Sequence, residues 1–487
     1  MGGGVALLDY DRDGRLDIFL VNGGHLEDSD KVPADFRRQN PNYWNRLYRQ
    51  QPDGKFLDVT ESAGLEKTPN VYGMGVAVGD FDNDGYPDIY LTGVGRNSLY
   101  RNEGGRGFTD VTREAGVEGG GWSVSAAFLD YDLDGRLDLF VSRYLDWDFA
   151  RTIQCGTPFF AYCRPEKYGA TANLLFHNEG GGRFRDVSAA SGMGAVKGKG
   201  MGVAVNDYDG DGWPDLFVSN DGMEQFLFRN QRDGTFTERA LEAGVALSDD
   251  ARSYAGMGVA FADMNNDGRP DIVVTNLATE KYALYQNEDG GAFRYVTLPT
   301  GLGALTARSS GWGVGLHDFD NDGEKDIFAA QSHVLDNVER IHPGLKYLEP
   351  PALYRQVKGR FLAEPLNLPA VAGRGVAFGD LNNDGAMDAV VAVLGGNPIV
   401  LMNRRAGPGL TLELTGTRAN RDGAGAVVRA GAQTVYATTS GSYLSANDAR
   451  VHLAGSPEKI EITWPGGKRQ TVERLAAGRV HAVKEKE

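Results

Sequence analysis

Apolar and polar positions recur along this chain in one fixed order, again and again. Each unit begins with a strand of small and apolar residues, as at 256–260, followed by an acidic turn and a second apolar strand, as at 271–274. A third strand places an apolar and an aromatic residue before a polar tip, as at 227–230, and a glycine-rich turn leads to a fourth, as at 184–187. Apolar runs bounded by Gly, Asn and Asp turns predict short antiparallel β-strands.

The acidic turn is the most specific part of the unit. The pattern Asp-x-Asp-x-Asp-Gly-x-x-Asp occurs seven times, with Asn265 and Asn382 in place of the second aspartate in the fifth and seventh copies. Four strands per unit and a repeat of roughly 50 residues or more predict a propeller, here an all-β, seven-bladed β-propeller with a calcium loop in each blade. A linear β-solenoid is the alternative, but its repeat would be far shorter.

Carboxylates at alternate positions of a tight loop converge on one point, where they repel each other unless a cation lies between them. Hard oxygen ligands in a loop that a glycine such as Gly14 lets turn sharply select calcium. The loops are not EF-hands, because the twelfth position holds residues such as Leu20 and Leu91 rather than a bidentate glutamate, and strands flank the loop. An acidic surface turn without metal is the alternative interpretation.

We expect four side chains and the backbone carbonyl of the seventh position to bind each ion, up to seven calcium ions in all, with weaker binding where Asn lowers the charge. Loop by loop, these residues are Asp9, Asp11, Asp13, Arg15 and Asp17; Asp80, Asp82, Asp84, Tyr86 and Asp88; Asp130, Asp132, Asp134, Arg136 and Asp138; Asp207, Asp209, Asp211, Trp213 and Asp215; Asp263, Asn265, Asp267, Arg269 and Asp271; Asp318, Asp320, Asp322, Glu324 and Asp326; Asp380, Asn382, Asp384, Ala386 and Asp388.

The repeats resemble the FG-GAP or VCBS repeats of integrin α-chain propellers and of many bacterial secreted proteins, over residues 1–405. The remainder, 406–487, contains 420–426 (Asn-Arg-Asp-Gly-Ala-Gly-Ala) and 462–467 (Ile-Thr-Trp-Pro-Gly-Gly). It is similar to the ASPIC/UnbV domain, which follows VCBS repeats in proteins resembling cartilage acidic protein. One departure is Leu453-Ala454-Gly455, where that family has Phe-Gly-Leu-Gly. The resemblance implies a small β domain docked on the propeller.

Net charge, hydrophobicity and cysteine content limit the partners and the cellular location that we expect for this protein. The net charge of −16 argues against nucleic acid as a partner, because phosphates need a basic surface. No run of eighteen apolar residues exists, so no membrane span is expected. Cys155 and Cys163 are expected to form a disulfide, with two reduced thiols as the alternative. Loops of this kind work where calcium is abundant, so we expect a monomer that is secreted, periplasmic or on the cell surface.

The beginning of the chain predicts a missing piece. Residues 1–4 run directly into an inner strand without an export signal, so we expect a start truncated upstream. Seven third strands but six fourth strands are recognisable, which leaves the seventh blade one strand short. Either an upstream strand completes this blade, or the tail strand at 410–414 covers its edge.

The predicted topology places the connection between second and third strands on the face opposite the metal loops. Three of these connections are long, at 22–46, 142–173 and 331–352, and insertions on one face mark a binding face. A ring of amides, arginines and aromatic residues suits a polar ligand such as a glycan or a peptide. Turn residues and a channel-filling Trp312 are the alternative interpretation. The candidate residues are Asn22, His25, Trp122, Arg143, Asn220, Asn276, Trp312, Gln331, His333 and Arg374.

Three functions compete. The first is a non-enzymatic module that binds an extracellular protein or glycan; the second is a polysaccharide lyase or hydrolase with its site at the channel mouth; the third is a scaffold whose tail makes the contacts. No catalytic residue is assigned, because no Gly-x-Ser-x-Gly, His-Glu-x-x-His or P-loop pattern occurs. His333 and Asp336 are the only tempting acid–base pair, and a zinc site on the loop histidines is disfavoured.

Overall fold

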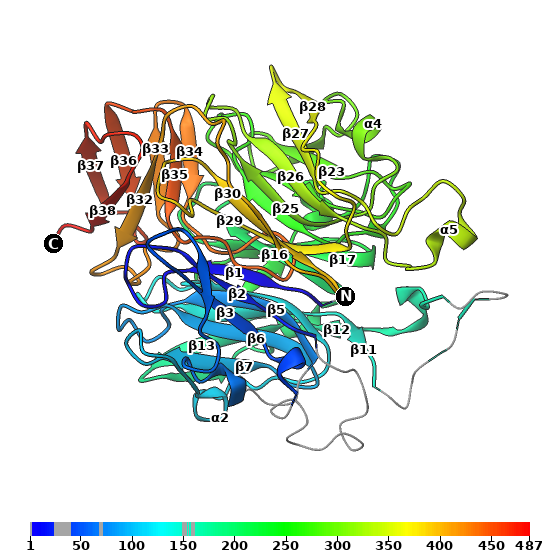
Figure 1. Cartoon of the computed structure of the whole chain (residues 1–487), viewed down its shortest axis with the longest axis horizontal. Coiled ribbons are helices and arrows are strands. Elements are labelled where there is room, and N and C mark those ends of the chain that lie inside the picture. Colours follow the sequence, from blue (N-terminus) through cyan, green and yellow to red (C-terminus); the bar gives the residue numbers. More distant parts are fainter. Residues whose placement is uncertain (1, 24–39, 68–71, 149–152, 154, 157–160) are drawn as a thin grey trace.

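Seven antiparallel sheets of the same strand order form the larger part of the protein, seen in a computed structural model that describes residues 2–23, 40–67, 72–148, 153, 155–156 and 161–487 (Figure 1). Within the described residues, five of these sheets contain four strands, the fourth sheet has β20 as a fifth strand paired with β17, and the last contains three. In every sheet the metal loop joins the innermost strand to the second. The all-β propeller predicted from the repeats is confirmed.

The strands of the seven sheets alternate in direction from the inside outward. In chain order they are β1 (Val5–Leu8), β2 (Asp17–Leu20), β3 (Arg46–Gln50) and β4 (Phe56–Asp58); β5 (Tyr72–Gly79), β6 (Asp88–Val94), β7 (Ser98–Asn102) and β8 (Phe108–Asp110); β9 (Ser123–Leu129), β10 (Asp138–Arg143), β13 (Leu174–Gly180) and β14 (Arg183–Asp186); β16 (Gly200–Asn206), β17 (Asp215–Met223), β18 (Phe226–Asn230) and β19 (Phe236–Glu238); β21 (Val259–Ala262), β22 (Asp271–Val274), β23 (Ala283–Asn287) and β24 (Phe293–Tyr295); β25 (Gly311–His317), β26 (Asp326–Gln331), β27 (Ala352–Val357) and β28 (Arg360–Glu364); β29 (Gly373–Gly379), β30 (Asp388–Val393) and β31 (Ile399–Leu401).

The sheets close into a ring. Each innermost strand contacts the innermost strand of the next sheet, and the last of them, β29, contacts β1. The crowding at the ring centre explains the small residues of the first strand: a Cβ on Gly258 would lie 2.0 Å from the carbonyl oxygen of Trp312, which no side chain tolerates. The residues between paired glycines, such as Met201 and Met257, line the channel instead and are almost fully buried.

The tail forms two further sheets on the metal-loop side of the ring, visible beyond the propeller in Figure 1. Its core contains Trp464, Ile460, Ile462 and Leu412, all nearly fully buried. One sheet has the order β35–β32–β38 and the other β34–β33–β36–β37. The bounds are β32 (Gly409–Thr415), β33 (Val427–Ala430), β34 (Gln433–Tyr436), β35 (Val451–Ala454), β36 (Lys459–Thr463), β37 (Arg469–Glu473) and β38 (Val480–Lys484).

The segment 438–448, between β34 and β35, leaves the tail and enters the central channel. Its backbone pairs with inner strands on several sides: the N–H of Ser442 donates to Val259 O at 2.6 Å, and the N–H of Val76 donates to Leu444 O at 3.0 Å. Tyr443 is fully buried, with its ring centroid 5.1 Å from that of Trp312. We call 438–448 the channel segment. The tail is therefore inserted into the propeller and not merely docked on it.

The tail does not complete the seventh blade. β32 pairs with β35 and β38, whereas β31 pairs with β30 alone among the described residues. The sequence-based alternative in which residues 410–414 cover the edge of the last blade is therefore wrong. The leucines of that segment are buried in the tail's own core, where they belong to one cluster with apolar side chains of β35 and β38.

The described parts of the long connections lie on the face opposite the metal loops, as predicted, and Figure 1 shows α5 and β11–β12 projecting there, away from the tail. No helix among the described residues is long and apolar enough to cross a membrane. The minor elements are β11 (Leu145–Asp146), β12 (Gly169–Ala172), β15 (Lys197–Gly198), β20 (Tyr254–Ala255), α2 (Thr112–Ala115), α3 (Ala240–Ala243), α4 (Leu302–Thr306) and α5 (Val338–Ile341), with 3-10 turns η2 (Pro41–Tyr43), η3 (Leu65–Lys67), η5 (Pro165–Lys167) and η6 (Met193–Ala195).

Candidate metal centres and binding face

All seven acidic loops share one internal hydrogen-bond pattern, which starts at the first aspartate. Asp9 Oδ1 accepts the N–H of Asp13 at 3.0 Å, and Oδ2 accepts the N–H of Gly14 at 2.8 Å. Gly14 has a φ of +83°, which glycine adopts without strain. Loops built alike therefore hold their carboxylates alike. The same two bonds are made by Asp80, Asp130, Asp207, Asp263, Asp318 and Asp380.

The ninth-position aspartate is almost fully buried in every loop. Asp17 is fully buried; its Oδ2 accepts the N–H of Tyr10 at 3.2 Å, and its Oδ1 accepts the N–H of Gln50 at 2.8 Å. Burial raises the pKa of Asp17 to about 8, since water no longer stabilises the charged form. Burial likewise raises the pKa of Asp271, Asp326 and Asp388 to about 7. A divalent cation in the loop would hold these carboxylates ionised.

The carboxylates converge in the way that a metal site requires. In each of the first four loops, oxygens from three aspartates lie within 4.8 Å of one another. Hard oxygen donors in this number fit calcium, which accepts six to eight oxygen ligands in flexible geometry. The residues present could therefore hold metal ions, and bound calcium would supply the positive charge that their mutual repulsion calls for. The four groups are Asp9, Asp11 and Asp13; Asp80, Asp82 and Asp88; Asp130, Asp132 and Asp138; Asp207, Asp209 and Asp215.

Basic side chains from the third strand reach the same loops, which sequence reasoning missed. Arg49 Nε lies 2.7 Å from Asp11 Oδ2, and Arg229 Nε lies 2.6 Å from Asp209 Oδ2. In the third sheet, His177 Nδ1 lies 3.2 Å from Asp138 Oδ1. The basic residue just before the polar tip of the third strand was the available signal. These side chains balance part of the loop charge; the two arginines contact the third-position carboxylate, and His177 contacts the ninth-position carboxylate.

Amide side chains link each blade to the one before it. The N–H of Asn178, the polar tip of β13, donates to Asp138 Oδ1, while its Nδ2 donates to Phe81 O of the preceding loop at 2.8 Å. Equivalent bonds run from Asn102, Asn230, Asn287, Gln356 and Asn403, and Gln50 closes the circle onto Leu381. The polar tip of each third strand therefore connects one metal loop with its neighbour.

Several metal loops also touch directly. Asn83 Nδ2 donates to Gly135 O of the third loop at 3.0 Å, and Asn383 Nδ2 donates to Gly14 O of the first at 2.8 Å. The fourth loop position holds Leu133 and Gly210 in the third and fourth copies, and neither side chain has a donor for such a bond. The loops are thus hydrogen-bonded to their neighbours around most of the ring.

We predict that Asp130→Ala removes one metal ion without abolishing the fold. Asp130 anchors the third loop through the N–H groups of Asp134 and Gly135, at 3.0 and 3.1 Å. Its loss removes a ligand and the bonds that shape the loop. The calcium content of the purified variant should fall by one ion per chain relative to the parent. An unchanged content would mean that this loop never held calcium.

The predicted ligand residues at the channel mouth divide into buried and partly exposed groups. Trp312 Nε1 donates to Ser332 O at 2.7 Å, and the guanidinium carbon of Arg374 lies 4.3 Å from the centroid of the Trp312 ring. These two side chains fill the channel over Tyr443. Ligand contact by the whole set stays a prediction. The buried members are Asn220, Asn276, Trp312, Gln331, His333 and Arg374, none more than 7% exposed.

Trp122, Arg143 and Asn22 are partly exposed, and His25 lies outside the described residues. Trp122 packs edge-on against Tyr144 and Trp147, with centroids 5.3 and 5.4 Å apart. Arg143 Nε has no hydrogen-bond partner among the described residues, and burial lowers the pKa of its guanidinium. Asn22 Nδ2 donates to Asn42 O at 2.7 Å. An arginine beside a group of aromatic rings therefore remains available at this mouth.

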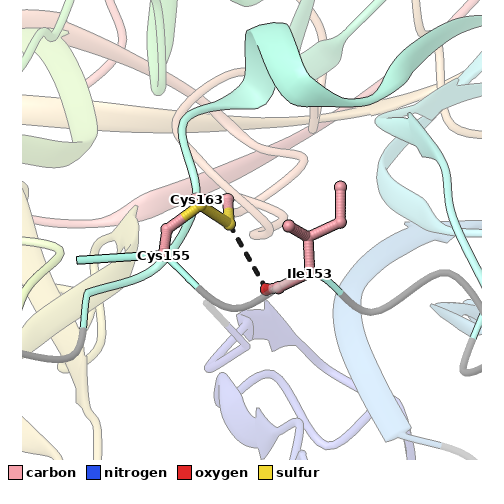
Figure 2. Close-up of a disulfide and its surroundings, with 3 residues drawn as sticks. All are labelled: Ile153, Cys155 and Cys163. Atoms are coloured by element: carbon pink, nitrogen blue, oxygen red, sulfur yellow. Dashed lines mark hydrogen bonds between the residues drawn. A yellow bond between two sulfur atoms is a disulfide. The ribbon is translucent and has the colours of Figure 1, made fainter. Parts of the chain in front are cut away.

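The Cys155–Cys163 disulfide lies on the same face and is present as predicted (Figure 2). Cys163 Sγ lies 3.3 Å from the carbonyl oxygen of Ile153. A disulfide sulfur carries no hydrogen, so we regard this as a close contact and not as a hydrogen bond. The bridge closes a short loop of the connection between β10 and β13.

A pair of carboxylates near this mouth escaped the sequence analysis. The hydroxyl of Tyr144 donates to Asp221 Oδ2 at 2.6 Å. Ala255 pairs with Asp221 across β17 and β20, and its N–H donates to Glu280 Oε2 at 2.9 Å. Burial raises the pKa of both Asp221 and Glu280. Neither residue belongs to a motif, so only the fold brings them near each other.

Comparison with protein families identifies both parts of the chain. A model described as "FG-GAP-like repeat" matches residues 9–91, 80–141, 162–218 and 207–274. A second, described as "ASPIC and UnbV", matches residues 416–487. Together these matches span well over half of the chain.

Similar proteins extend this result. The chain is 27% identical to cartilage acidic protein 1 of Homo sapiens over 99% of this chain and 71% of that protein. It is 26% identical to the Mus musculus protein over 96% and 70%. Among solved structures, an Agrocybe aegerita lectin specific for non-reducing terminal N-acetylglucosamine aligns with a TM-score of 0.45 and 15% identity, over 83% of this chain and 95% of that one. The exotype rhamnogalacturonan lyase YesX aligns with a TM-score of 0.41 and 14% identity, over 83% and 72%. These structural similarities are too distant to carry a ligand or a reaction.

Proposed function

This chain belongs to the family of FG-GAP-like repeat proteins with an ASPIC and UnbV domain. From that premise we propose that it is a calcium-loaded, non-catalytic extracellular module that binds a protein or a carbohydrate. One observation carries the proposal: the channel segment fills the centre of the ring with Tyr443 and Leu444, both at most 1% exposed. The tail lies on the metal-loop face, so the opposite mouth is the face left for a partner.

Calcium is the ion that the loops fit best. They offer only oxygen donors apart from His177, and carboxylates in flexible loops prefer calcium to smaller or softer ions. We propose up to seven ions, one per loop, as structural elements of the ring. The Cys155–Cys163 disulfide supports a secreted, periplasmic or surface location, where calcium is abundant and thiols are oxidised.

The binding face is supported by its chemistry. Trp122, Tyr144 and Trp147 group beside the partly exposed Arg143, and aromatic and arginine side chains contribute most of the energy at protein interfaces. Aromatic rings also pack against the apolar faces of sugars. A glycan or a protein with an acidic group would meet both features. A monomer suffices for this arrangement, because the face is formed within one chain.

We expect Trp122→Ala to weaken partner binding by about thirtyfold, the effect of losing one aromatic anchor. A glycan array and a panel of immobilised extracellular proteins, both with calcium, would first identify a partner. Leu241→Ala is the matched control, because Leu241 is 72% exposed on α3. Thermal melting of each variant would separate misfolding from lost contact. A partner bound equally by the parent and by Trp122→Ala would place the binding face elsewhere.

A second candidate function, a polysaccharide lyase or hydrolase, is favoured by Asp221 and Glu280. A buried carboxylic acid with a raised pKa is what a general acid requires. Incubation with acidic and neutral polysaccharides would distinguish the two functions. New reducing ends or unsaturated products that disappear in Glu280→Gln would establish the enzyme, whereas binding without turnover in the parent would support the module.

A further inference from the structure

The tail forms hydrogen bonds with the metal loops themselves and not only with the strands of the propeller. Thr411 Oγ1 donates to Asp380 Oδ2 of the seventh loop at 3.1 Å. Asn420 Nδ2 lies 3.4 Å from Asp130 Oδ2 of the third loop. The N–H of Asp80, in the second loop, donates to Asp422 Oδ2 at 2.9 Å. In each case the tail reaches the first aspartate, which is a predicted metal ligand.

The seventh loop receives the most support. Arg450 donates from Nη2 to Asp380 O and from Nη1 to Asn383 Oδ1, both at 2.7 Å. His452 Nε2 lies 2.9 Å from Gly385 O. Of these side chains, Thr411 lies on β32, Arg450 directly precedes β35, and His452 lies within β35. Folding of the tail therefore fixes all three together.

The fifth loop provides a comparison within the same chain. It has the same pattern as the seventh, with Asn265 where the seventh has Asn382, and both have one carboxylate fewer than the others. Asp263 accepts only the N–H groups of Asp267 and Gly268 among the hydrogen bonds of the described residues. On the side of the fifth loop, a cavity of about 120 Å³ lies between the tail and residues such as Ala262 and Lys325.

We propose that the tail completes the metal centres of the second, third and seventh loops, with Thr411 as the positioning residue for Asp380. This inference rests on the proposed calcium loading. A hydrogen bond to one carboxylate oxygen fixes the group and orients its other oxygen toward the ion, as outer-shell partners do in metal sites. The seventh loop, short of one carboxylate, binds calcium more tightly than the fifth because the tail holds its first ligand.

Tail docking and calcium binding are then reciprocally linked. Whatever factor the docked tail adds to calcium affinity, bound calcium adds to docking of the tail. The channel segment belongs to the tail, so calcium in these loops also holds Ser442 and Leu444 in the channel. The N–H of Ser442 donates to Val259 O at 2.6 Å, and the N–H of Leu444 donates to Ser125 Oγ at 3.2 Å. The exchange rates of these two amides therefore report whether the channel segment is in the channel.

Calcium titration of the full chain tests the proposal. Thr411→Val keeps the shape of a buried strand residue and removes only the hydroxyl, so one site should weaken by about tenfold or more. Thr415→Val, four residues along the same strand, is the matched control and should leave the isotherm unchanged. In an Asp380→Ala background the effect of Thr411→Val should disappear, because both act on one site.

Two further measurements make the test decisive. Asp422→Asn, which removes a charge beside the second loop, should weaken a different site. Hydrogen exchange at Ser442 and Leu444 should accelerate when calcium is removed. An isotherm that neither Thr411→Val nor Asp422→Asn changes would overturn this inference alone, as would an equal effect of Thr411→Val with and without Asp380. A parent chain that binds no calcium would overturn the calcium-loaded module as well.

Discussion

Excess chelator is expected to lower the melting temperature of this protein by about 10 °C or more. Each loop brings carboxylates together, and the ninth-position aspartates, such as Asp88 and Asp215, are almost fully buried. Without a cation these groups must be protonated or must repel one another inside the protein. An ion that binds only the native state stabilises it by roughly 3–4 kcal/mol per site at 100–1,000 times its dissociation constant.

Thermal melting with and without chelator, followed by excess calcium, measures this effect. Calcium should restore the original melting temperature. Magnesium should restore much less of it, because this smaller ion requires octahedral geometry and keeps its water. A melting temperature that chelator leaves unchanged would show that the loops are stable without metal and would remove the basis of the calcium assignment.

Tyr443→Ala should destabilise the protein by about 3–5 kcal/mol, the range for a fully buried aromatic residue. Tyr443 stands in the channel and packs on Trp312, Met74 and Met257, which come from three different blades. Loss of the ring leaves a cavity that rigid inner strands cannot close. The effect should appear as one cooperative change in the propeller and not as local loosening of the tail.

Chemical denaturation of the variant and of Tyr443→Phe measures this contribution. The phenylalanine variant keeps the ring and should retain most of the stability. If Tyr443→Ala were as stable as the parent, the channel segment would contribute little to the free energy of unfolding. Contacts between the blades would then account for the stability of the propeller. Calcium must be held constant, since bound ions raise the apparent stability of every variant.

The acidic loops, the strands and the order of strands within a sheet were predictable because each is a local property. The five positions that define a metal loop lie within nine residues, so their convergence depends on backbone geometry near one glycine. The small and apolar residues of the first strands were likewise visible in the sequence. The sequence did not indicate that the tail is one of the segments packed against these strands. A Cβ on Gly202, for example, would lie 3.0 Å from Ser442 O of the channel segment.

Tertiary structure alone decided what connects these local units. The channel segment joins positions far apart in the chain: Ala6 pairs with Ala446, and Thr411 reaches Asp380. The amide tips of the third strands look like turn residues until the neighbouring blade supplies a carbonyl acceptor, as Phe81 does for Asn178. Periodicity records which residues share a face, because that follows from backbone geometry; it does not record which distant surface covers that face, because many surfaces of similar shape and polarity would satisfy the same pattern.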